Sequence, residues 1–227
     1  MILEGDTQWI KRPGQFVNIE LEGLYLRRPI SICDWDDKTI TIIYKVVGKG
    51  TEQMSQMQPG VELDVLTGLG NGFNPEPAVE NTKSLLVGGG VGVPPLYHLA
   101  KVLLAAGRKV SVVLGFNTAA EVFYADEFRA LGADVYVSTA DGSMGVKGFV
   151  TDAIREAAID FDYFYSCGPL PMLKALCGCT DKPGELSFEE RMGCGFGACM
   201  GCSCKTLTGN KRICKEGPVM RREEIIW

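Results

Sequence analysis

The chain has 227 residues, a formal net charge of −5, and a composition that is 46% hydrophobic and 22% charged. These values are typical of a globular protein with one large or two small domains, and the acidic balance argues against general nucleic-acid binding, which depends on clustered lysine and arginine. A single histidine excludes chemistry that needs several imidazoles, and nine cysteines cannot all be paired within one chain.

The N-terminal residues contain neither a basic region nor a sustained apolar stretch, so we expect no signal peptide. The longest uncharged run, residues 84–100, is interrupted by glycine and proline and is too short to cross a bilayer comfortably. We therefore expect a cytoplasmic location. In a reducing compartment, clusters of cysteine serve metal or redox chemistry more often than disulfides.

Alternating apolar and polar positions in the first 76 residues predict short strands at 16–21, 39–47 and 61–65. Sequences rich in glycine, proline and aspartate separate these strands and are typical of turns. Strands at this spacing predict a small antiparallel β-barrel over residues 1–76.

After a predicted linker at 72–77, strands and helices alternate. The expected strands are 84–87, 109–114, 133–138 and 162–166, and the expected helices are centred on 96–103, 121–131 and 151–159. This alternation predicts an α/β domain over residues 77–182 with a doubly wound parallel sheet, whose ligands bind at the carboxyl ends of the strands.

The remaining segment, 183–227, carries five of the nine cysteines and little periodicity, so we expect a metal centre to order it. Four cysteines have the C-x4-C-x2-C spacing, plus a distant fourth, that is associated with plant-type [2Fe–2S] centres: Cys194, Cys199, Cys202 and Cys214. Glycines between them can free backbone N–H groups to face the cluster. Structural zinc is the alternative, although it usually uses two separated C-x2-C pairs or histidine ligands.

Cys204 competes for the fourth ligand position. It lies two residues beyond Cys202, and we expect its strand position to turn it away from the cluster, so Cys214 is preferred. Cys33, Cys177 and Cys179 have no partners at comparable spacing and are expected to be packed thiols.

Two motifs in the α/β part suit a nucleotide. The first buried strand is followed by a glycine-rich turn, Gly88, Gly89, Gly90, Val91 and Gly92, which would let a pyrophosphate approach the backbone at a helix N-terminus. The turn departs from G-x-G-x-x-G, so a purely structural turn is the alternative. The last strand ends at Cys167, Gly168 and Pro169, where Cys167 is expected beside the cofactor or, alternatively, in a plain turn.

The barrel part offers further candidates. A predicted strand carries Arg28, Pro29, Ile30 and Ser31, in which Arg28 suits a phosphate and Ser31 suits a ring nitrogen. A turn with N–H donors, Gly50 and Thr51, follows Ile43, Tyr44 and Lys45.

The succession of R-P-I-S, G-G-G-V-G and C-G-P resembles the ferredoxin reductase superfamily, whose members hold FAD on the barrel and NAD(P) on the α/β domain. The tail is more specific. E-E-R-M-G-C-G-F-G-A-C-M-G-C at 189–202 and R-I-C-K-E-G-P-V at 212–219 resemble the electron-transfer subunits of NAD-linked (type B) dihydroorotate dehydrogenases. D-G-S-M-G-V-K-G-F-V-T-D at 141–152 is also similar to that family.

The resemblance implies that the barrel candidates bind FAD, the α/β candidates bind NAD(H), and the four cysteines hold a [2Fe–2S] cluster, with Ser31 and Cys167 as candidate catalytic residues. The chain departs from the family in two places. Relatives usually begin with an additional strand before the segment matching 13–16, which implies a barrel that lacks a strand or closes imperfectly. Lys45 stands where arginine is common and loses bidentate phosphate geometry.

The implied function is electron transfer. The nicotinamide exchanges hydride with FAD, and the cluster exchanges single electrons with an FMN-containing catalytic subunit, two copies of each forming a heterotetramer that oxidises dihydroorotate to orotate in pyrimidine biosynthesis. NAD is favoured over NADP because no arginine follows residues 115–118 until Arg129. The alternatives are a reductase subunit of a ferredoxin:NADP, sulfide or hydrogenase-linked complex, and a zinc-stapled scaffold that binds nucleotide without turnover.

Overall fold

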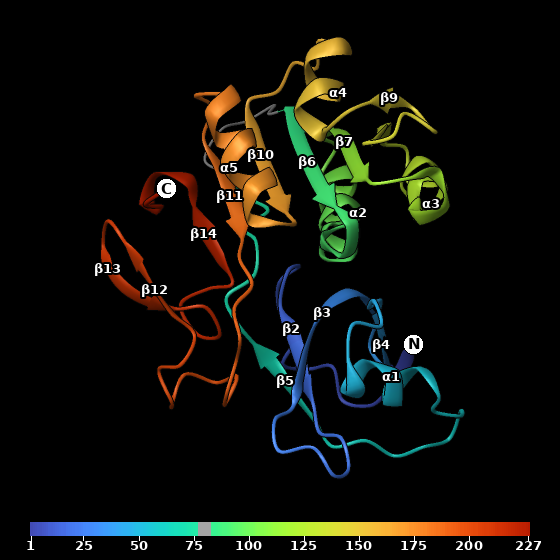
Figure 1. The fold of residues 1–227 in the computed structure, drawn as a ribbon, viewed down its shortest axis with the longest axis vertical. Coiled ribbons are helices and arrows are strands. Elements are labelled where there is room, and N and C mark those ends of the chain that lie inside the picture. The colour runs from blue at the N-terminus through green and yellow to red at the C-terminus, as the bar shows by residue number, and fades with distance from the viewer. Residues whose placement is uncertain (77–82) are drawn as a thin grey trace.

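The structure, a computed structural model, describes residues 1–76 and 83–227 (Figure 1). The N-terminal part is an antiparallel sheet with strand order β1-β4-β3-β2-β5. Its strands are β1 (Ile2–Glu4), β2 (Phe16–Ile19), β3 (Arg28–Trp35), β4 (Thr39–Ile42) and β5 (Val65–Leu69). Among the described strands β1 and β5 do not pair, so the predicted barrel is an open half-barrel in which one short strand, β1, precedes the segment at 13–16.

Two sequence expectations for this part are wrong. Residues 61–64 lie outside any strand, because β2 ends at Ile19, whose partner Val65 is the first residue of β5. The segment after Gly48 is helix α1 (Lys49–Ser55) instead of a turn, so Gly50 and Thr51 lie in its first turn. The predicted strand at 39–47 is also shorter than expected, because the chain leaves the sheet after Ile42.

The large sheet has strand order β14-β11-β10-β6-β7-β8-β9, and every pairing is parallel except that between β11 and β14. Its strands are β6 (Lys83–Gly89), β7 (Lys109–Phe116), β8 (Asp134–Thr139), β9 (Val146–Lys147), β10 (Tyr163–Cys167), β11 (Gly184–Ser187) and β14 (Val219–Arg221). The flanking helices are α2 (Tyr97–Ala105), α3 (Ala125–Ala130), α4 (Val150–Glu156) and α5 (Leu170–Cys179).

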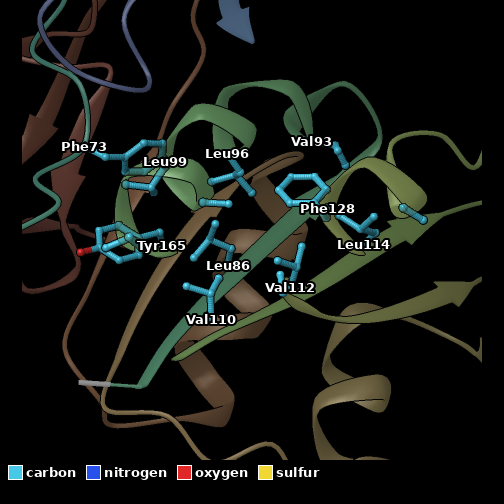
Figure 2. Close-up of a cluster of buried hydrophobic side chains, with 14 of the residues drawn as sticks. Phe73, Leu86, Val93, Leu96, Leu99, Val110, Val112, Leu114, Phe128 and Tyr165 are labelled. Atoms are coloured by element: carbon cyan, nitrogen blue, oxygen red, sulfur yellow. The ribbon is translucent and has the colours of Figure 1, made fainter. Parts of the chain in front are cut away.

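Helices cover both faces of this sheet, which confirms the doubly wound arrangement. Leu86 of β6 points to one face and packs with Leu96, Leu99 and Phe128, as Figure 2 shows. The neighbouring Leu85 and Val87 point to the other face and pack against α4 and α5. Because successive strand residues face opposite ways, a strand buried on both sides is apolar throughout.

The C-terminal segment, residues 183–227, contributes two strands to the large sheet of the preceding part. Strands β11 and β14 belong to the large sheet, while β12 (Ser203–Thr206) and β13 (Gly209–Arg212) form a separate hairpin (Figure 1). The large sheet includes strands on both sides of the predicted domain boundary at 182/183. That boundary therefore stays a proposal about which residues bind which cofactor. Residue 77 lies outside the described residues. The predicted boundary at 76/77 and the end of the predicted linker at 72–77 therefore fall outside the described part of the chain.

A polar clamp joins β3 of the half-barrel to α2. The carboxylate of Asp34 accepts hydrogen bonds from Lys101 Nζ, at 2.8 Å to Oδ2, and its Oδ1 lies 2.5 Å from His98 Nδ1. Trp35 stacks on the His98 ring with centroids 3.6 Å apart. Burial alone would raise the pKa of Asp34, but the hydrogen bonds from His98 and Lys101 outweigh it and the pKa is lowered. The only histidine of the chain thus has a structural partner.

We expect Asp34→Asn to lower the free energy of unfolding by about 1–2 kcal/mol, because it removes a charged acceptor from two donors. Asp37→Asn removes the same charge from an exposed position nearby and serves as the control. Urea denaturation at neutral pH measures both. Since the folded-state pKa of Asp34 is lowered, its contribution is complete at neutral pH and is lost as the pH falls below the ordinary aspartate value of about 4. Equal denaturation midpoints for the two variants would contradict the clamp.

Candidate functional site

A cleft of about 940 Å³ lies between the half-barrel and the large sheet, at the carboxyl ends of β6, β7, β8 and β10. This is where ligands of doubly wound sheets bind. Its walls include most of the predicted cofactor residues: Pro29, Ser31, Ile43, Tyr44, Lys45, Gly89, Gly90, Val91, Gly92, Cys167, Gly168 and Pro169. The predicted residues outside its lining are Arg28, Ile30, Gly50, Thr51 and Gly88.

The glycine-rich turn and the Cys167 segment touch through their backbones. A Cβ atom on Gly92 would lie 2.2 Å from the carbonyl oxygen of Cys167, and one on Gly89 would lie 2.6 Å from Met172 Sδ. Gly90, in contrast, has a φ of +53° and open space around it. Gly89 and Gly92 are therefore required by packing, as a structural turn requires, whereas Gly90 presents bare backbone to the cleft, and nucleotide binding there stays a prediction.

Arg28 and Gly50, predicted separately as phosphate-binding residues, lie against each other. A Cβ atom on Gly50 would approach Arg28 Nε to 2.1 Å, so a side chain at this position would displace the guanidinium. The Thr51 hydroxyl is used within its own turn, accepting from Val47 N at 2.9 Å and donating to Gly48 O at 3.0 Å. Thr51 thus holds the start of α1 in the position that Arg28 contacts.

Lys45 forms an ion pair across the cleft. Its Nζ lies 3.5 Å from Oε1 of Glu121, a cleft residue that sequence reasoning missed. Glu121 accepts hydrogen bonds from the backbone and side chain of Asn117, at 3.1 and 2.9 Å, and these bonds lower its pKa. A carboxylate is therefore fixed just beyond the end of β7.

The two candidate catalytic side chains both line the cleft. Ser31 lies on β3 opposite Phe16 of β2. Burial raises the pKa of Cys167 to about 12, against the smaller opposing effect of a hydrogen bond with Ser187. Cys167 is therefore a neutral thiol at physiological pH and adds no charge to the cleft.

The C-terminal segment supplies a further wall of the cleft that sequence reasoning missed. Glu189, Glu190 and Met192 line it, although their motif was used only as a sign of family resemblance. Phe16 and Phe149 are also lining residues, and no local pattern marks them, because each looks like an ordinary apolar position of a strand or a helix start.

The four predicted ligands are arranged as two pairs. The Cys202 and Cys214 sulfurs are 3.3 Å apart and buried, whereas Cys194 and Cys199 share a loop in which the N–H of Cys199 points at Cys194 Sγ at 3.4 Å. No group of three or more candidate ligands surrounds one point in residues 1–76 and 83–227. Two pairs suit the two irons of a [2Fe–2S] cluster, whereas structural zinc needs four ligands around one ion.

Backbone donors favour charged sulfur at this centre. Burial would raise the pKa of Cys194, but N–H groups, including those of Cys199 and Ala198, lower it to about 6. The N–H of Cys214 points at Cys202 Sγ, at 3.4 Å. These donors fit an anionic cluster, because amide dipoles stabilise negative charge on its sulfurs.

The expected orientation of Cys204 stays a prediction. Cys204 lies on β12 and Cys202 in the turn just before that strand, and Cys204 packs against the same group of apolar side chains as Cys202 and Cys214. What distinguishes it is the absence of a thiol partner among the described residues, since the close sulfur contact joins Cys202 to Cys214. The preference for Cys214 stays a proposal on this new ground.

Arg212 and Glu216 connect the two loops that carry the paired cysteines. The Arg212 guanidinium bonds both oxygens of Glu216, with Nε 2.9 Å from Oε2, and its Nη1 donates to the carbonyl of Gly197. The ion pair lowers the pKa of Glu216 to about 2. One side chain thereby fixes the loop of Cys214 to the loop of Cys194 and Cys199.

Cys214→Ser is expected to lose most of the bound iron, because it removes one thiol of the buried Cys202–Cys214 pair. Cys204→Ser is the matched control and is expected to keep iron at the level of the unaltered protein. Iron and acid-labile sulfide per chain, measured after anaerobic purification, decide between them. The reverse result would assign the fourth ligand to Cys204.

Comparison with known families is consistent with this geometry. Residues 189–226 match the family model described as the iron-sulfur cluster binding domain of dihydroorotate dehydrogenase B. Residues 86–178 match the oxidoreductase NAD-binding domain. Of the helices described in 1–76 and 83–227, none is long and apolar enough to span a bilayer.

Similar proteins cover nearly the whole chain. The dihydroorotate dehydrogenase B (NAD(+)) electron transfer subunit of Geobacillus kaustophilus is 50% identical over 97% of this chain and 89% of its own length. That of Fusobacterium nucleatum is 47% identical over 95% and 87%. A solved NADH-dependent reduced ferredoxin-NADP oxidoreductase superposes with a TM-score of 0.85 at 35% identity, over 96% of this chain and 80% of that one. A cytochrome P450 reductase from Amycolatopsis shares the fold, with a TM-score of 0.64 at 23% identity. The chain therefore belongs to the family of dihydroorotate dehydrogenase B (NAD(+)) electron transfer subunits.

Proposed function

We propose that this protein carries electrons between a dihydroorotate-oxidising partner subunit and NAD, using a [2Fe–2S] cluster and FAD. The observation that carries the proposal is a cleft lined on one side by Ser31 and residues 43–45 of the half-barrel and on the other by the glycine-rich turn and Cys167. Its lining residue Phe16 packs with Cys202 and Cys214. A flavin suits this role because it exchanges two electrons as hydride with a nicotinamide and single electrons with an iron–sulfur centre.

We assign the cofactors to three parts of the chain. FAD is held by residues 1–76, with Arg28 and Gly50 toward its phosphates and Ser31 at its ring. NAD(H) is held by residues 77–182, with Gly90 and Val91 presenting backbone and Cys167 a neutral thiol. The cluster is held by residues 183–227 through the two cysteine pairs.

Glu121 supports NAD over NADP. Its carboxylate is fixed beyond the end of β7 by Asn117, and it would repel the 2′-phosphate of NADP. The first arginine of the following segment, Arg129, bonds Asp126 and is not a lining residue of the cleft.

We further propose that the partner contains FMN, that two copies of each subunit assemble, and that the complex works in the cytoplasm. The relatives are named as electron transfer subunits, which calls for a separate catalytic subunit. No disulfide joins the cysteines of the described residues, which fits a reducing compartment.

Purification followed by a coupled assay tests the function. The protein is expected to be yellow-brown, to release flavin on boiling, and to give an EPR signal after reduction. With its co-purified partner it is expected to support NAD+-dependent oxidation of dihydroorotate. A colourless preparation that contains zinc would contradict electron transfer and favour a scaffold.

A second candidate is a ferredoxin-linked reductase, which the 35% identity to the ferredoxin-NADP oxidoreductase favours. Ferredoxin reduction that exceeds dihydroorotate oxidation in the same preparation would support it. The higher identity of the dihydroorotate dehydrogenase relatives makes the opposite ratio the expected one.

Gly50→Ala is expected to weaken FAD binding about tenfold or more, because the added methyl group displaces Arg28 and removes a charge-assisted phosphate contact. Gly48→Ala adds the same methyl group where nothing lies within 4 Å and is the control. Flavin fluorescence titration of the deflavinated proteins measures both. Equal affinities would remove Arg28 from the FAD site.

A further inference from the structure

Strand β2 has two faces with different tasks. Val17 and Ile19 point into the half-barrel core and are fully buried there. Phe16 and Asn18, on the opposite face, meet the C-terminal segment that carries the cysteines. The strand therefore lies between the half-barrel core and the cysteine-bearing segment.

Phe16 contacts both sites. Its side chain lines the cleft and packs in one apolar cluster with Cys202 and Cys214, while only 3% of it is exposed. Its cross-strand neighbour is Ser31, the residue assigned to the flavin ring. One aromatic side chain thus separates the flavin cleft from the buried cysteine pair.

Asn18 fixes the loop of the other pair. It is 1% exposed, and its Nδ2 donates to the carbonyl of Cys194 at 3.3 Å. Gly195 makes this approach possible, because it has a φ of +79° and a Cβ atom there would lie 2.4 Å from Nδ2.

The placement of Asn18 is costly. Its Oδ1 is buried without a hydrogen-bond partner among the described residues. A buried unpaired amide oxygen destabilises the fold, so an apolar residue of the same shape would be favoured unless the amide held something in place. Among the described residues, the Asn18 side-chain amide hydrogen-bonds only to the carbonyl of Cys194.

We propose that Phe16 and Asn18 are positioning residues that set the place of the iron–sulfur centre relative to the flavin. Cys202 and Cys214 are then the pair that faces the flavin, and Cys194 and exposed Cys199 are the pair that faces outward. The two side chains hold positions and exchange no electrons or protons themselves. The inference rests on the proposed binding of FAD and the cluster. It adds which residues set the position of the cluster relative to the FAD.

Asn18→Leu tests the proposal, because leucine keeps the approximate shape and removes the donor to Cys194. We expect an altered EPR line shape of the dithionite-reduced cluster and about fivefold faster loss of iron to a chelator, with flavin content unchanged. Ile19→Val, on the same strand but facing the half-barrel core, is the control and is expected to match the unaltered protein in all three measurements.

A second variant approaches the same contact from the loop. Gly195→Ala places a methyl group against Asn18 and is expected to change the EPR line shape as well. Gly209→Ala, also at a positive φ but with nothing within 4 Å, controls for backbone strain. This pair keeps the test decisive if Asn18→Leu does not fold.

The outcomes separate the inference from the function on which it rests. If the unaltered protein binds flavin and iron, and if Asn18→Leu and Gly195→Ala match their controls in EPR line shape and iron release, the positioning role alone is overturned. A parent protein that binds neither flavin nor iron overturns the proposed function, and the inference with it.

Discussion

The arrangement of the site depends on the contact between β2 and the cysteine-bearing segment. Because side chains alternate along a strand, Val17 and Ile19 pack into the half-barrel core, whereas Phe16 and Asn18 contact the cysteine-bearing segment. That alternation brings the half-barrel against the segment that carries the cysteines. The contact involves only Phe16 and Asn18 of β2, but the hydrogen bond from Asn18 to Cys194 joins residues 176 positions apart in the chain.

The second constraint is how the half-barrel sits on the large sheet. The polar clamp from Asp34 to His98 and Lys101 ties the strand that carries Ser31 to the helix that follows the glycine-rich turn. On the other side of the cleft, the missing side chain of Gly92 lets the turn reach the backbone of Cys167. These contacts fix the distance across which a flavin and a nicotinamide must meet.

The pKa values of Cys167 in the cleft and Cys194 in the C-terminal segment are shifted in opposite directions. Cys167 is buried and neutral, so it lines the cleft without adding charge, whereas backbone N–H groups lower the pKa of Cys194 and favour its thiolate form. The Arg212–Glu216 pair then holds both ligand loops. The same side-chain type therefore serves two roles, according to whether apolar groups or amide donors surround it.

The sequence by itself determined the alternation of strands and helices in the α/β part, the doubly wound sheet, the cysteine spacing and twelve of the residues that line the cleft, because periodicity and glycine or cysteine motifs are local signals. It could not place helix α1, the end of β2 that leaves residues 61–64 unpaired, or the strands β11 and β14 inside the large sheet, since each depends on which strand is available as a partner. It also gave no role to His98, Glu121, Phe16 or Asn18. Only the tertiary structure decided those roles, because a side chain that acts through residues distant in sequence leaves no spacing or composition by which it can be recognised.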